Sequence, residues 1–163
     1  MINWNKLQPY KLAKQKSYEQ LCFQIAFKLF EDSGTFSLID DSGGGDGVEF
    51  YLTLPDGEQW GWQAKYYEGS PRLREHNRKQ NIIASLKRAI EVHPNLKRWY
   101  LCLPMDLTPL EAEWIRNVLP SHVPNNRHVE VGEEYLWNES FIHEKLNQPR
   151  FNGLKQAFLT SWN

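Results

Sequence analysis

The chain has 163 residues, which is enough for one domain with its own hydrophobic core. Its formal net charge of −1 excludes the strong overall positive charge of many nucleic-acid-binding proteins. Only two cysteines occur, Cys22 and Cys102, each in an apolar run, and the sequence has neither a CxxC motif nor a signal-peptide or membrane-spanning pattern. We therefore expect a cytoplasmic protein with buried, reduced thiols and no disulfide framework.

The charges are unevenly distributed along the chain. Between Lys28 and Lys65 there is no lysine or arginine but there are eight acidic residues. From Lys65 to Arg98 nine basic residues stand against three acidic ones. Such a division is typical of two solvated faces of opposite sign, and it is also what a cation site beside a phosphate-binding surface requires.

The N-terminal part predicts an arm followed by a buried helix. Residues 1–16 are basic and amphipathic and indicate a short helix or an arm. Ser17 and Gln20 have the spacing of a capping box, so we expect a helix from Ser17 to about Glu31. Because this segment is apolar nearly all round, the helix should be buried. Glu19 falls in its first turn, where a carboxylate is favourable whether or not it has a function.

The next part of the chain predicts three strands. Residues 35–39 indicate an edge strand, and the glycine-rich stretch 43–47 then leads into a strand at 48–52. A tight turn at 55–57 joins it to a second strand that contains Gln63 and Lys65. Alternation places Val48, Phe50 and Leu52 on one face of the first strand. A hairpin of this kind can bring Glu49, Gln63 and Lys65 side by side.

The remaining sequence alternates between helices and strands. We expect a polar, basic loop at 68–77, a helix at 78–93, a buried strand at 99–103, a helix at 108–118 opened by a capping box, a loop at 120–126, a short strand at 128–131 and a helix at 133–146. This order predicts an α/β fold with a mixed central β-sheet flanked by helices. The apolar tail 149–163 either docks on the domain or leads into further domains of a longer protein, and the second alternative is the expected one.

The hairpin region resembles a known family. The sequences G-G-D-G-V-E-F-Y and W-Q-A-K-Y-Y are similar to the signature of PD-(D/E)xK nucleases, in the Mrr-like branch where Gln-x-Lys replaces Glu-x-Lys. The similarity spans roughly residues 17–104 and is greatest to nuclease domains fused to bacterial antiviral NTPases. It implies a restriction-endonuclease-like core in a single domain, 1–163, with Mg²⁺-dependent DNA endonuclease activity.

The resemblance also implies roles for individual residues. Glu49 would be the central ligand of Mg²⁺, for which Mn²⁺ could substitute, and the side-chain carbonyl of Gln63 would be a second ligand. The backbone carbonyl of Ala64 is a further candidate ligand. Lys65 would orient the attacking water or stabilise charge on the phosphorane. Glu19 would complete the site, and Asp46, in the glycine turn, is the alternative to Glu49 as principal ligand.

The expected partners follow from the same resemblance. Double-stranded DNA is the expected substrate, with phosphate contacts from four basic residues: Arg72, Arg74, Arg78 and Lys79. Self-association or fusion to an oligomerising NTPase or sensor domain is expected, with no membrane partner. The alternative is a catalytically inactive nuclease-like module that binds nucleic acid or a partner chain.

Overall fold

A tight turn at Pro55–Gly57 joins two antiparallel strands at the centre of the fold, as the sequence predicts. The structure is a computed structural model that describes residues 2–8, 14–39, 45–67, 73 and 75–159. Its strands form one five-stranded mixed sheet in the order β1-β2-β3-β4-β5. They are β1 (Thr35–Leu38), β2 (Phe50–Thr53), β3 (Gln59–Ala64), β4 (Leu96–Cys102) and β5 (Leu136–Trp137). The first three are antiparallel neighbours, whereas β3, β4 and β5 run parallel.

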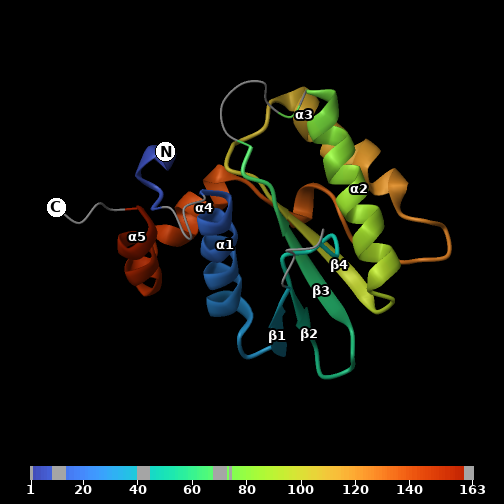
Figure 1. The fold of residues 1–163 in the computed structure, drawn as a ribbon, viewed down its shortest axis with the longest axis horizontal. Helices are drawn as coiled ribbons and strands as arrows, with labels where there is room; N and C mark the ends of the chain where they lie inside the picture. The colour runs from blue at the N-terminus through green and yellow to red at the C-terminus, as the bar shows by residue number, and fades with distance from the viewer. Residues whose placement is uncertain (1, 9–13, 40–44, 68–72, 74, 160–163) are drawn as a thin grey trace.

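Helices cover both faces of this sheet (Figure 1). On one face lie α1 (Lys14–Phe30), α4 (Glu139–Leu146) and α5 (Asn152–Leu159), and on the other lie α2 (His76–Val92) and α3 (Pro109–Glu113). The predicted α/β class, with a mixed sheet flanked by helices, is confirmed and is consistent with a nuclease-like core. No helix in the described part of the chain has the length and apolar character needed to cross a membrane.

Each face of the sheet has its own hydrophobic core. The core under α1 contains many aromatic rings, and Trp62 is stacked between Phe50 and Tyr100 at ring distances of 5.1 and 4.6 Å. The core under α2 is mainly aliphatic, and the five residues predicted to point inward from this helix are all buried: Ile82, Ile83, Leu86, Ala89 and Ile90. Both cysteines are buried free thiols, as expected.

Helix α1 begins earlier than the sequence predicts. It starts at Lys14, so Ser17 lies inside the helix, fully buried, and is not its N-cap. The predicted arm is therefore shorter, and it packs on the domain through Trp4, whose ring lies 5.5 Å from that of Tyr18. The extra helical residues include Gln15, which hydrogen-bonds to the sheet, a long-range contact that local capping patterns do not reveal.

The C-terminal half departs further from the prediction. The predicted strand at 128–131 is wrong, since only a single bridge pairs Glu130 with Arg98. The predicted helix at 133–146 is divided into a 3-10 turn, the strand β5 and α4, because residues 136 and 137 pair with β4 and Asn138 then caps α4. The Thr108 capping box is confirmed, and the helix it opens continues as a π-helical turn, Trp114–Val118. The predicted loop at 120–126 begins within a 3-10 helix, Leu119–His122.

The part of the apolar tail that the structure describes, residues 149–159, docks on the domain. The expectation that the tail leads into further domains stays a prediction. Phe151 is fully buried, and Leu159 of α5 belongs to the same aromatic core. The backbone of Gln8 donates to the carbonyl of Phe158, which joins the N-terminal arm to α5. The segments before and after the predicted nuclease core therefore stabilise the outer side of α1.

Candidate active site

Glu49 is positioned at the end of the hairpin by Gly47, whose backbone packs closely against α2. Gly47 has a φ of 79°, and a Cβ at this position would lie 2.1 Å from the carbonyl oxygen of Ser85. Its own carbonyl accepts a buried hydrogen bond of 2.9 Å from the indole of Trp99. Only glycine fits this backbone and this space.

Glu49 itself lies immediately before β2, held by the backbone on both sides. Its N–H donates to the carbonyl of Trp62 at 2.7 Å, and its carbonyl accepts from the N–H of Ile39 at 3.0 Å. The expected alternation of side chains between the two faces of the sheet fails at Val48, one residue before Glu49. Val48 packs in the core under α2, against Gly61, whereas Phe50 lies in the core under α1. The backbone is therefore irregular at Val48. From Glu49 onward it forms the regular antiparallel hydrogen bonds to β3.

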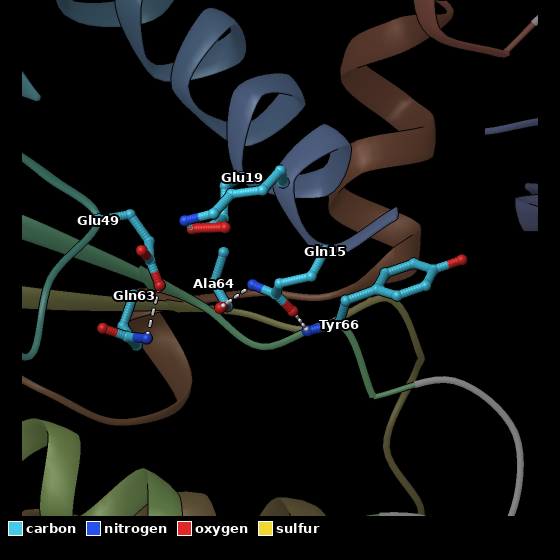
Figure 2. A network of polar contacts seen from close by, with 7 residues as sticks. Gln15, Glu19, Glu49, Gln63, Ala64 and Tyr66 are labelled. Atoms are coloured by element: carbon cyan, nitrogen blue, oxygen red, sulfur yellow. Dashed lines mark hydrogen bonds and ion pairs between the residues drawn. The ribbon is translucent and has the colours of Figure 1, made fainter. Parts of the chain in front are cut away.

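The side chain of Glu49 meets that of Gln63 across the hairpin. The Gln63 amide nitrogen donates to Glu49 Oε1 at 2.7 Å (Figure 2), and Gln63 is buried, at 7% exposure. In this arrangement the amide acts as a donor to the carboxylate. A ligand role for Gln63 requires its amide to turn so that the oxygen faces the ion.

Glu49, Gln63, Lys65 and Glu19 line one cavity of about 420 Å³. The predicted site residues thus come together from the glycine turn, the end of β3 and α1. Burial lowers the pKa of the Lys65 ammonium below its usual value, and the carboxylates of Glu49 and Glu19 oppose this shift. A partly desolvated ammonium beside two carboxylates is typical of functional sites.

Glu19 reaches the cavity from the second turn of α1 and is almost fully buried. One carboxylate oxygen lies 3.5 Å from Lys16 Nζ. The other, Oε2, is buried and makes no hydrogen bond within the described part of the chain. A buried carboxylate oxygen without a partner is costly, so this atom is better explained by a ligand than by a favourable charge at a helix start.

Asp46 is turned toward a different partner. Its carboxylate lies 3.7 Å from Nε2 of His93, at the end of α2, and it does not line the cavity. Burial lowers the pKa of His93, and the charge of Asp46 opposes this effect. Of the two alternative principal ligands, the structure brings Glu49 to Gln63 and Lys65 and leaves Asp46 beside the end of α2.

The donor set in the cavity suits a magnesium ion that keeps part of its water shell. Within the described residues no three His, Cys, Asp or Glu side chains are grouped as a metal site. Two carboxylates and one amide oxygen are nevertheless available, and Mg²⁺ is commonly bound by one or two carboxylates with water in the other positions. The unpartnered Glu19 oxygen is the observation that favours such a ligand.

The four predicted phosphate contacts are only partly placed. Arg72 and Arg74 lie outside the described residues. Arg78, in the first turn of α2, stacks over the ring of Tyr67 at 4.7 Å, and Tyr67 lines the cavity. Lys79 lies over the ring of Trp114 at 5.7 Å. These two neighbouring side chains therefore point to different surroundings, and Arg78 is the one beside the cavity.

Several residues of the site could not be predicted from the sequence. Asn81 and Ser85 line the cavity from the polar side of α2. From the sequence, only the apolar side of this helix was given a role, in the core. Gln15 lies one turn before Glu19 on α1, but it precedes the helix start that the sequence predicts. Glu111 of the capping box also accepts a hydrogen bond from the buried N–H of Leu73, which ties Leu73 to α3.

Comparison of the chain with models of known protein families finds no match, and comparison with curated proteins finds none at a significant level. The resemblance to Mrr-like nucleases therefore remains a prediction. What supports a functional hypothesis is the geometry of the cavity and the chemistry of its residues.

Proposed function

We propose that this protein is a Mg²⁺-dependent endonuclease that hydrolyses phosphodiester bonds of double-stranded DNA. The observation that carries the proposal is the meeting of Glu49, Gln63, Lys65 and Glu19 around one cavity. Glu19 is buried, and Glu49 and Lys65 are half-buried beside it. Removing two carboxylates and a lysine from full solvation in this way costs free energy unless the group serves a purpose. Its position between the glycine turn and the cationic start of α2 suits a substrate with a phosphate backbone.

The proposed roles follow from the donors that each residue offers. Glu49 and Glu19 would hold the ion with their carboxylates, and Gln63 would contribute its amide oxygen. When bound, the ion neutralises phosphate charge and lowers the pKa of a coordinated water. Lys65 supplies a positive charge close to the reacting phosphate, where negative charge increases in the transition state. Arg78 contacts the DNA backbone at the edge of the cavity.

The proposal is tested by incubating supercoiled plasmid with the purified protein in the presence of Mg²⁺, Mn²⁺ or EDTA. We expect nicked or linear DNA with either metal and none with EDTA. Glu49→Ala should abolish cleavage and weaken Mg²⁺ binding measured by calorimetry, whereas Asp46→Ala should have a milder effect. Cleavage that is unaffected by EDTA, or that survives Glu49→Ala and is lost in Asp46→Ala, would contradict the assignment.

Gln63→Glu gives a sharper test of the ligand set. It restores the acid found in most of the superfamily that the sequence resembles, and it places a third carboxylate in the cavity. We expect tighter Mg²⁺ binding with at least part of the activity retained. Weaker binding would show that Gln63 serves as a donor to Glu49 and not as a ligand.

One observation favours a second candidate function, a catalytically inactive module that binds nucleic acid or a partner chain. The Gln63 amide donates to Glu49 at 2.7 Å, as a purely structural partner of the carboxylate would. This candidate predicts DNA binding that is unchanged by Mg²⁺, together with no cleavage under any metal condition. Filter binding and the plasmid assay on the same preparation distinguish the two.

The wider biological setting is also a proposal. A role as effector of a bacterial antiviral protein, with self-association or fusion to an NTPase, rests on the family resemblance alone. A cytoplasmic location is supported by the two buried free thiols. Sedimentation of the protein with and without DNA measures self-association, and a monomer that linearises plasmid rapidly would count against it.

A further inference from the structure

Lys65 directly follows β3, and among the described residues a strand flanks it on only one side. On the β4 side, the N–H of Lys65 donates to the carbonyl of Cys102 at 3.0 Å. On the other side, β2 is paired up to the Phe50–Trp62 position, and the last ladder bond comes from Glu49. The described residues before Glu49, 45–48, do not extend the pairing with β3. The carbonyl of Ala64 and the N–H of Tyr66 therefore face a place that β2 does not fill.

The side-chain amide of Gln15 occupies that place. Its nitrogen donates to the carbonyl oxygen of Ala64 at 3.0 Å, and its oxygen accepts from the N–H of Tyr66 at 2.8 Å (Figure 2). These are the two bonds that one residue of a parallel strand would make to the neighbours of Lys65. Among the described residues, a single side chain from α1 thus makes the contacts of a neighbouring strand residue.

We propose that Gln15 is a positioning residue that holds the Lys65 backbone in register for catalysis, an inference that rests in its catalytic part on the proposed function. We call the pair of hydrogen bonds to Ala64 and Tyr66 the Gln15 clamp. With Cys102 on one side and the clamp on the other, the backbone around Lys65 is fixed from both directions. The ammonium then has only its own side-chain torsions left to vary.

The clamp also sets the spacing between two parts of the cavity. Gln15 and Glu19 are four residues apart and therefore lie on the same side of α1. Both line the cavity. By tying the first turn of α1 to the end of β3, the clamp fixes the carboxylate of Glu19 relative to Lys65. Displacements of about 1 Å in such an arrangement can lower turnover on the order of 100-fold.

Gln15→Met is the variant that tests this directly. Methionine keeps the length of the side chain but removes both hydrogen bonds. We expect turnover of plasmid to fall roughly 10- to 100-fold while KM for DNA changes little. By hydrogen-exchange NMR, the amide of Tyr66 should exchange faster, since its acceptor is lost. Gln24→Met is the matched control, because Gln24 is half-buried on the same helix and makes no hydrogen bond to the described residues.

Gln15→Glu separates the two bonds of the clamp. The glutamate side chain can still accept a hydrogen bond from the N–H of Tyr66. Its second oxygen, however, cannot donate one to the carbonyl of Ala64. We expect the Tyr66 amide to remain protected and turnover to lie between those of the parent and Gln15→Met. All assays are run well below the melting temperatures of the variants, so that loss of folded protein does not contribute.

The outcomes distinguish the clamp from the proposed function. If the parent protein cleaves DNA and Gln15→Met matches it in turnover, the positioning role is wrong. Unchanged exchange of the Tyr66 amide in Gln15→Met would overturn the clamp itself, whether or not the parent is active. A parent that does not cleave DNA with any metal overturns the proposed function and with it the catalytic part of this inference.

Discussion

Two successive residues of β3, Trp62 and Gln63, project to opposite faces of the sheet and into opposite surroundings. Trp62 is fully buried and stacked between two aromatic rings. Gln63 is nearly as buried but lies in a polar cavity, bonded to a carboxylate. The comparison indicates that the aromatic face supplies the stability that holds the strands in register. The polar cavity around Gln63, where burial is costly, can then present a reactive group.

Truncating both residues should separate these contributions, and this is the largest effect we expect. Trp62→Ala should lower the free energy of unfolding by about 3–5 kcal/mol, because it empties the centre of the aromatic core. Gln63→Ala should cost about 1 kcal/mol, since water in the cavity can replace its bond to Glu49. Urea denaturation followed by circular dichroism measures both. Equal losses of unfolding free energy in the two variants would contradict the proposal that Trp62 contributes far more to stability than Gln63 does.

The glycine turn provides a second test, through two glycines that both have a positive φ. Gly47→Ala should lower the free energy of unfolding by about 2–4 kcal/mol, because backbone strain adds to a clash with α2. Gly57→Ala, with open space around its Cβ, should cost about 1 kcal/mol from strain alone. Thermal unfolding of both variants checks the difference. If the two melt alike, the close approach to α2 is not what fixes Glu49.

Arg78 and Lys79 allow a finer comparison between neighbouring cations with different surroundings. The log-log dependence of DNA affinity on salt should become shallower by about one unit in Arg78→Ala, because one phosphate contact is lost. Lys79→Ala should change the slope less, since its ammonium lies over Trp114. Fluorescence anisotropy over a range of salt concentrations measures both slopes. A larger change for Lys79 would move the DNA path toward α3.

The smallest expected effect concerns acid stability. The lowered pKa of His93 means that the unfolded chain takes up this proton at a higher pH than the folded protein does. Stability from this residue is therefore full above about pH 6.5 and is lost as the pH falls below it. Asp46 and the ring of Tyr51 face the imidazole. His93→Gln should flatten the fall in melting temperature from pH 7 to pH 5, and an unchanged profile would contradict this.

Local sequence spacing explains what was predicted well. The turn at 55–57 fixes the length of the hairpin, and the glycine turn and strand alternation place Glu49 and Gln63 close together. The predicted alternation failed at Val48. Its side chain packs against Gly61 in the core under α2, not on the face that carries Phe50.

Features that depend on long-range contacts were not predictable in the same way. The start of α1 was hidden by a capping-box pattern at Ser17, so the role of Gln15 could not be seen. The two-residue strand β5 exists because β4 is beside it, and its own sequence reads as part of a helix. The docking of the tail depends on the surface of α1, which no local pattern describes.

The central claim is that Lys65 acts on a phosphate at a metal site, and Lys65→Ala tests it most directly. Plasmid cleavage with Mg²⁺ and DNA affinity are measured on the same preparation, with circular dichroism as a control for folding. We expect cleavage to be abolished while affinity and fold are retained, because the ammonium is needed where charge increases in the transition state. A Lys65→Ala protein that cuts DNA as fast as the parent would contradict the account.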